Sequence, residues 1–124
     1  MLLIEDNADE RRAYSVRLRE KGWSVVELES GENALTWALA LVPDIIVTDL
    51  KMPGVDGTEA MRQLKSDPRT AHIEVIVLSG FAERSGDAYG AGCHTFLSKP
   101  CLPETLIEIM DAIRMDRPSV KLRV

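Results

Sequence analysis

Short apolar runs alternate with longer amphipathic stretches along the whole chain. The apolar runs have the length of β-strands and lie at 1–4, 23–28, 44–49, 73–78 and 95–97. Between them, apolar residues recur at helical spacing, which predicts helices at 8–21, 30–42, from 56, around 84–91 and from 103. Ser30 and Asp56 are suitable N-caps, and Gly22 is a suitable helix stop. Strands and helices that alternate in this way predict an α/β fold, with a parallel sheet covered on both faces.

Composition fits one small globular domain. The chain has 124 residues, with 45% hydrophobic and 28% charged residues. None of the apolar runs approaches the ~20 residues that a membrane helix needs, and the first run lacks the basic flank of a signal peptide. Cys93 and Cys101 show no metal-binding or disulfide spacing, so we expect free thiols and a cytoplasmic location. Trp23 and Trp37 have no polar partners in the sequence and are expected to be packing residues.

The net charge of −5 argues against binding along a nucleic-acid backbone, which requires a basic face. It leaves room for a cation or a protein partner.

Acidic and polar side chains gather at the predicted strand ends. Glu5 and Asp6 follow the first run, Asp49 closes the third, Ser79 follows the fourth and Lys99 follows the fifth. Ligands of open parallel sheets bind outside the carboxyl ends of the strands, so these residues are the candidates for chemistry. Two like charges ~4 Å apart repel by about 4 kcal/mol at an effective dielectric constant of ~20. Three converging carboxylates therefore need a proton, a shifted pKa or a cation.

Oxygen ligands of this kind favour Mg²⁺, and no His or Cys pattern supports zinc. A lysine and a hydroxyl beside the acids suit the handling of a phosphoryl group. The cation and Lys99 would neutralise its oxygens, Ser79 would donate a hydrogen bond, and one carboxylate would be the nucleophile.

Four motifs, each closing an apolar run, resemble one known family. They are Leu3-Ile4-Glu5-Asp6-Asn7, the segment 44–57 around Asp49, Val77-Leu78-Ser79-Gly80, and the segment 91–100 that ends in Phe96-Leu97-Ser98-Lys99-Pro100. Over nearly its whole length the chain resembles the receiver domain of two-component response regulators, of the chemotaxis-regulator type. The resemblance implies a three-layer flavodoxin-like fold with a five-stranded parallel sheet in the order 2-1-3-4-5. It also implies a receiver domain at 1–116, with 117–124 as a tail or the start of a linker.

The resemblance assigns roles to individual positions. Asp49 would be the phosphoacceptor, Asp6 would bind Mg²⁺ directly, Glu5 would bind it through water, and the backbone carbonyl of Lys51 would complete the protein ligands. Mn²⁺ is an alternative ion. Ser79 would bond the phosphoryl oxygen, and Lys99 would pair with it.

Further positions of the family pattern lie nearby. Phe96 stands at the place of the switch aromatic, which turns inward as the Ser79 hydroxyl moves. The Lys99–Pro100 peptide would be cis, and Gly57 would serve the tight loop after the acceptor. Lys51 and Phe81, two residues past the acceptor and the hydroxyl, would tune dephosphorylation. Glycines at 80, 86, 90 and 92, in a segment shorter than is usual for the family, predict a short or loose fourth helix.

These features predict a phosphorylation-dependent signalling switch rather than an enzyme with an external substrate. It would take a phosphoryl group from a sensor histidine kinase or phosphotransfer protein onto Asp49 and change a surface for an output domain or protein partner, with a homodimer as a further option. One alternative is a receiver-like interaction module that is never phosphorylated. Another is an aspartyl-phosphate hydrolase, but Lys51 breaks the Asp-x-Asp pattern of such enzymes, and the sequence has no cap domain.

Overall fold

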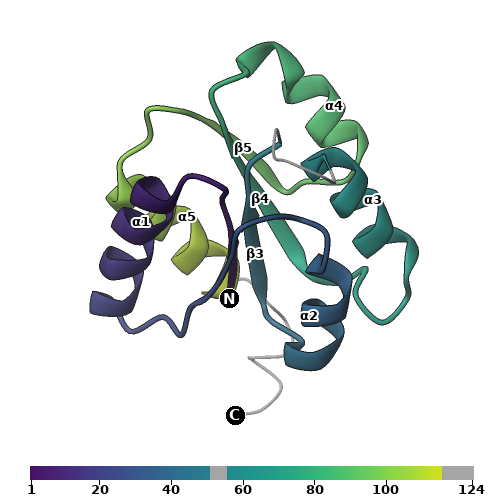
Figure 1. The fold of residues 1–124 in the computed structure, drawn as a ribbon, viewed down its shortest axis with the longest axis horizontal. Helices are drawn as coiled ribbons and strands as arrows, with labels where there is room; N and C mark the ends of the chain where they lie inside the picture. Colours follow the sequence, from purple (N-terminus) through teal and green to yellow (C-terminus); the bar gives the residue numbers. More distant parts are fainter. Residues whose placement is uncertain (51–55, 116–124) are drawn as a thin grey trace.

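A five-stranded parallel sheet lies between two layers of helices (Figure 1). The structure is a computed structural model, and it describes residues 1–50 and 56–115. The strands are β1 (Leu2–Ile4), β2 (Val26–Leu28), β3 (Ile45–Thr48), β4 (Glu74–Ser79) and β5 (Thr95–Ser98). The helices are α1 (Ala8–Glu20), α2 (Ala34–Leu41), α3 (Gly57–Ser66), the single 3₁₀ turn η1 (Ala82–Arg84), α4 (Ser85–Gly90) and α5 (Pro103–Met115). The strand order is β2-β1-β3-β4-β5 with every pair parallel, so the predicted fold class and strand order are confirmed.

The strands are buried because helices cover both faces of the sheet. Successive side chains of a strand point to opposite faces, and the core divides accordingly. Ile45, Val47, Ile76 and Leu78 face α1 and α5, whereas Ile46, Val75 and Val77 face α2, α3 and α4. The central strands β3 and β4 therefore need apolar residues at consecutive positions, as their sequences show.

The end of α1 and the start of α3 lie at the residues predicted to cap them, whereas the start of α2 does not. Gly22, with φ of +90°, follows the end of α1, and the Asp56 carboxylate accepts a hydrogen bond from the Thr58 N–H at 2.8 Å to cap α3. The prediction that Ser30 caps α2 was wrong, because the helix begins at Ala34. The Ser30 hydroxyl instead accepts a 3.4 Å bond from the Glu32 N–H, so it serves a preceding turn.

The two tryptophans have different environments. Trp23 is buried, and the Arg114 guanidinium lies 3.6 Å from its ring centroid. Trp37 remains 40% exposed, so only part of its side chain can pack against the protein. Trp37 lies on α2, which comes last in its helical layer beyond α3, and the outer face of α2 has no neighbouring element among the described residues (Figure 1).

The predicted short fourth helix and the lack of a membrane-spanning helix can both be checked in the structure. The fourth helix is short as expected, with only six residues in α4. Within the described ranges, no helix combines the length and the apolar character that crossing a bilayer requires. The expected tail at 117–124 lies outside the described residues.

Candidate active site at the carboxyl edge of the sheet

Backbone hydrogen bonds continue the sheet past its strand ends and fix the candidate residues at one edge. The Asp49 N–H donates to the Ile4 carbonyl at 3.2 Å, and the Lys99 N–H donates to the Ser79 carbonyl at 2.9 Å. On the other side of β1, the Glu5 N–H donates to the Leu28 carbonyl at 3.0 Å. The residues that follow β1 and β3 are thus held side by side, and Lys99 is held at the same edge beside the end of β4, by the ladder that builds the sheet.

Three carboxylates meet at this edge. One carboxylate oxygen each from Glu5, Asp6 and Asp49 lies within 4.8 Å of the other two. Glu5 and Asp49 are buried, whereas Asp6 is exposed. Backbone donors orient the buried pair: Asp49 Oδ1 accepts from the Leu50 N–H at 2.7 Å, and Glu5 Oε2 accepts from the Asn7 N–H at 3.1 Å. The convergence predicted from the strand ends is confirmed.

Lys99 places its ammonium group among the acids. Its Nζ lies 2.6 Å from Glu5 Oε1, 2.9 Å from Asp49 Oδ2 and 3.1 Å from Glu10 Oε1. Burial alone would lower the pKa of Lys99, but its hydrogen bonds to Glu5 and Asp49 outweigh that effect and raise the pKa above its usual value. Lys99 is therefore a permanent cation at neutral pH.

For the neighbouring Glu5 carboxyl, the effect of burial on the pKa outweighs that of its hydrogen bonds. Desolvation raises the pKa of Glu5, and the hydrogen bonds from Lys99 and the Asn7 N–H only partly offset this rise. Among the described residues, three carboxylates gather at this edge around the one ammonium group of Lys99, so negative charge is in surplus there.

A divalent cation with oxygen ligands fits this surplus. Glu5, Asp6 and Asp49 would hold it, since Mg²⁺ is typically bound through one or two carboxylates and several waters. The predicted carbonyl ligand, Lys51, lies outside the described residues.

Ser79, Phe96 and Phe81 occupy the β4 and β5 side of the edge. Ser79 is fully buried at the end of β4, and its Oγ accepts a hydrogen bond from the Phe81 N–H at 3.1 Å. Phe96 is half-buried against the core under α2–α4, and its N–H donates to the Tyr89 hydroxyl at 3.1 Å. Phe81 itself is 38% exposed. Their expected roles in switching and dephosphorylation stay predictions.

Gly57 lies against the backbone of the candidate nucleophile. Its N–H donates to the Leu50 carbonyl at 2.6 Å, and a Cβ at this position would come within 2.1 Å of the Asp49 carbonyl oxygen. Glycine is thus required for a close approach of α3 to Asp49. The Lys99–Pro100 peptide is cis, as the resemblance implied.

Two charged residues near the edge were missed in the sequence. Glu10, on the first turn of α1, reaches Lys99, and Arg84, in η1, binds the Asp56 and Thr58 side chains. Strand-end reasoning does not find them because both belong to helical turns. The sequence signal for Glu10 was the pattern Asn7-x-x-Glu10, which is typical of a capping box.

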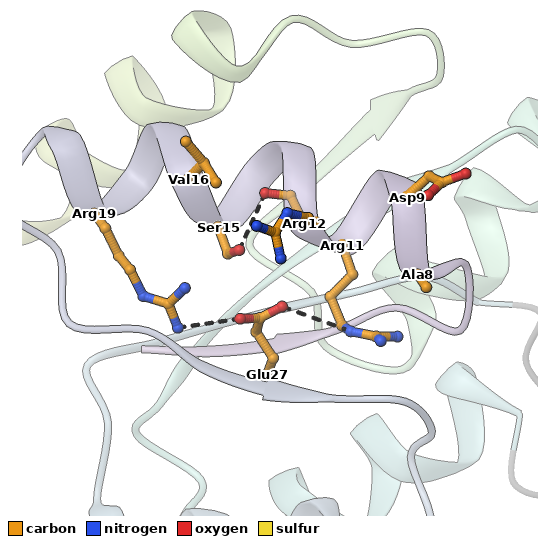
Figure 2. Close-up of a pocket in the computed structure, with 8 residues that line it drawn as sticks. All are labelled: Ala8, Asp9, Arg11, Arg12, Ser15, Val16, Arg19 and Glu27. Carbon is orange, nitrogen blue, oxygen red and sulfur yellow. Dashed lines mark hydrogen bonds and ion pairs between the residues drawn. The ribbon is translucent and has the colours of Figure 1, made fainter.

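A separate pocket of 310 Å³ lies between α1 and β2 (Figure 2). Arg19 and Arg11 converge there on Glu27, at 3.1 Å and 3.6 Å. Arg11 and Arg19 share the Glu27 carboxylate, so this pocket lacks the surplus of carboxylates that marks the carboxyl edge.

Comparisons with known proteins show the family of the chain. The response regulator receiver domain family matches residues 1–111. Protein PilH of Pseudomonas aeruginosa is 30% identical over 91% of this chain and 95% of its own length. Response regulator PleD of Caulobacter vibrioides is 34% identical over 81% of this chain, which corresponds to only 22% of PleD.

A solved structure shows the same fold. The receiver domain of a sensor histidine kinase from Pseudomonas aeruginosa PAO1 superposes with a TM-score of 0.82 at 26% identity, over 90% of this chain and 93% of that one. That structure has a magnesium ion coordinated in its active-site cleft. Family match, fold and strand-end residues agree, and the chain belongs to the receiver domain family of response regulators.

Proposed function

We propose that this receiver domain is a phosphorylation-dependent switch whose phosphoacceptor is Asp49. The observation that carries the proposal is the position of the Asp49 carboxylate, which is gathered with Glu5 and Asp6 and held 2.9 Å from the Lys99 ammonium. Phosphorelay signalling is the role of the family, and the donor would be a sensor histidine kinase or a phosphotransfer protein.

The chemistry follows from the side chains around Asp49. A carboxylate oxygen of Asp49 forms a bond to phosphorus while the bond from phosphorus to the donor histidine nitrogen breaks, and that imidazole leaves with its electron pair. Lys99 compensates the charge of the phosphoryl oxygens, and the Ser79 hydroxyl donates a hydrogen bond to one of them. Mg²⁺ held by Glu5, Asp6 and Asp49 supplies further charge compensation when bound.

The response to phosphorylation would begin at Ser79. Its Oγ now accepts from the Phe81 N–H, so a shift of the hydroxyl toward the phosphoryl group changes the start of the segment that leads to η1 and α4. Phe96 on the adjacent strand β5 would follow by turning inward, which changes the surface near α4 for an output domain or protein partner. The receiver domain would span 1–116, and a homodimer, Mn²⁺ as an alternative ion and the cytoplasmic location stay predictions.

Intact-mass spectrometry tests the proposal. With Mg²⁺ and a small phosphodonor such as acetyl phosphate, the wild-type chain is expected to gain the mass of one phosphoryl group, and Asp49→Asn is expected to gain none. Chelation of Mg²⁺ in the wild-type chain is the matched control, and it should also abolish the gain. An unchanged wild-type mass with small donors and with histidine kinases contradicts the proposal and favours an interaction module that is not phosphorylated.

A further inference from the structure

Glu10 is an acidic side chain at the site that neither the carboxylate cluster nor the helix cap accounts for. It lies on the first turn of α1, and its Oε1 is 3.1 Å from Lys99 Nζ. The three carboxylates that gather within 4.8 Å are those of Glu5, Asp6 and Asp49, so Glu10 stands outside the candidate metal ligands. Its contact with the site is therefore through the lysine.

The capping-box interpretation of Glu10 fails on its hydrogen bonds. In a capping box the Glu10 carboxylate would accept from the Asn7 N–H. Here that N–H donates to Glu5 Oε2 at 3.1 Å, and only the other half of the box forms, with the Glu10 N–H donating to Asn7 Oδ1 at 2.9 Å. Glu5 thus takes the backbone donor of Asn7, and the Glu10 carboxylate is directed to Lys99.

Lys99 donates hydrogen bonds to Glu5 and Asp49, and the Glu10 carboxylate is its third charged partner. Its ammonium is thus surrounded by three carboxylates at 2.6 Å, 2.9 Å and 3.1 Å. The exposed fractions of the side chains are 5% for Glu5 and 12% for Asp49 but 42% for Glu10. Glu10 is accordingly the partner on the solvent side, from which a phosphodonor must come.

We infer that Glu10 is a positioning residue that opposes phosphoryl transfer and favours the divalent cation. This inference rests on the proposed function of Asp49. The phosphoryl oxygens must share the Lys99 ammonium with the Glu10 carboxylate and must approach its negative charge, whereas a cation is attracted by that same charge. Loss of the Glu10 contact would not displace Lys99, because the buried Glu5 and Asp49 carboxylates hold its ammonium through hydrogen bonds.

The test is Glu10→Gln, which keeps an acceptor oxygen and removes the charge. The variant is expected to bind Mg²⁺ several-fold more weakly in calorimetric titration. At saturating Mg²⁺ it is expected to be phosphorylated by acetyl phosphate about three- to tenfold faster than the wild-type chain. The difference in rate should shrink as salt rises, since Glu10 is partly exposed and the Debye length falls from about 10 Å at 0.1 M to about 3 Å at 1 M.

Asp9→Asn is the matched control. Asp9 precedes Glu10 in the same first turn of α1, so its loss affects the helix dipole to a similar degree, but it makes no contact with Lys99 among the described residues. The control should leave both the Mg²⁺ affinity and the phosphorylation rate near the wild-type values.

The opposite signs of the two effects distinguish this role from a structural one. A merely structural residue would weaken Mg²⁺ binding and phosphorylation together, and that result overturns the inference, as do unchanged values for Glu10→Gln or equal changes in Asp9→Asn. A wild-type chain that binds Mg²⁺ but accepts no phosphoryl group overturns the proposed function, and the inference with it.

Discussion

Two clusters of charged side chains lie near the carboxyl end of the sheet and are built differently. The Lys99 cluster joins Lys99 to Glu5, Glu10 and Asp49, and so connects β5 to β1, α1 and β3. The Arg84 cluster consists of Arg84, Asp56, Thr58 and Asp87. Its central contacts run from the Arg84 guanidinium to Asp56 at 3.0 Å and to Thr58 Oγ1 at 3.1 Å, which connects η1 to the start of α3.

The clusters differ in burial and in charge balance. The Lys99 side chain is 15% exposed, and those of its partners Glu5 and Asp49 are 5% and 12% exposed. In this cluster the carboxylates outnumber the ammonium group. Arg84 and Asp56 are 28% and 42% exposed, where water screens any imbalance. A buried surplus of one sign requires a proton, a shifted pKa or a ligand of the other sign, whereas an exposed and nearly balanced pair requires none. This contrast supports the proposal that the Lys99 cluster is the functional one.

Gly57 lies between the two clusters, and its substitution is expected to have the largest effect. In Gly57→Ala the new Cβ would meet the Asp49 carbonyl oxygen at 2.1 Å and the Leu50 Cα at 2.9 Å, and both are backbone atoms that cannot turn aside. Moving α3 away would strain both clusters at once, so we expect a loss of about 3 kcal/mol or more in the free energy of unfolding. Urea denaturation followed by circular dichroism measures it.

Gly80→Ala is the control for this prediction, because a Cβ there meets no atom within 4 Å. A stability of Gly57→Ala equal to that of Gly80→Ala would show that α3 does not approach Asp49 as closely as described.

Removal of Lys99 is expected to have the next largest effect. Lys99→Ala leaves the buried Glu5 and Asp49 carboxylates without their cation, and a loss of about 2–3 kcal/mol is expected, at the low end for a buried pair because the ammonium is not fully enclosed. Mg²⁺ should restore part of this loss, since it compensates the same charges. Thermal unfolding with and without Mg²⁺ measures both effects, and a Lys99→Ala variant as stable as the wild-type chain without Mg²⁺ contradicts the prediction.

The Lys99 cluster could largely be predicted from the sequence, for a physical reason. Parallel strands end at one edge, so the residues that follow the adjacent strands β1 and β3 must be neighbours once the strand order is known. Lys99 follows β5, one strand further along the same edge, and its long side chain spans β4 to reach them. The same argument fails for side chains on helices, because the rotation of a helix about its axis is set by packing. Glu10 was missed on that account, and so was Arg84.

Errors in the helices have a similar origin. Ser30 has the right chemistry for an N-cap, but the same hydroxyl can serve a turn, and only the position of α2 against the sheet decides between them. An apolar helix such as α2 predicts burial on all sides. Trp37 stays 40% exposed because the sheet and α3 cover only part of that helix.

The raised pKa of Glu5 in the Lys99 cluster predicts a pH dependence opposite in sign to that of the Asp56 carboxyl in the Arg84 cluster. A carboxyl whose pKa is higher in the folded than in the unfolded chain binds protons more tightly when folded, so stability without Mg²⁺ should rise as pH falls toward 4.5. Glu5→Gln should remove this rise, and Mg²⁺ should flatten it by favouring the ionised carboxylate. Urea denaturation midpoints, measured from pH 8 to pH 5 in steps of about 1 pH unit, give this change in stability.

Other carboxyl groups with shifted pKa values affect stability in a lower pH range than Glu5 does. The pKa of Asp67 is lowered to about 2 by its hydrogen bonds with Arg69, and hydrogen bonds with Arg84 and Thr58 lower the pKa of Asp56 despite partial burial. A lowered pKa gives stability that is lost only as pH falls below the usual carboxyl range. Burial lowers the pKa of the Met1 ammonium, so its contribution to stability falls as pH drops below 8.0. The comparison with Glu5→Gln separates the two groups, and a wild-type profile that runs parallel to that of Glu5→Gln from pH 8 to pH 5 would contradict the burial of Glu5.

The smallest effect is expected in the Arg84 cluster. Arg84→Gln removes a partly exposed ion pair and should cost about 0.5 kcal/mol. Asp56→Ala should cost about 1 kcal/mol, because it also removes the N-cap bond to the Thr58 N–H. Neither loss should change when Mg²⁺ is added, since Arg84 and Asp56 do not contact the carboxylates at the edge. A loss in Arg84→Gln that is as large as in Lys99→Ala, or that Mg²⁺ reverses, would mean that the two clusters act as one unit.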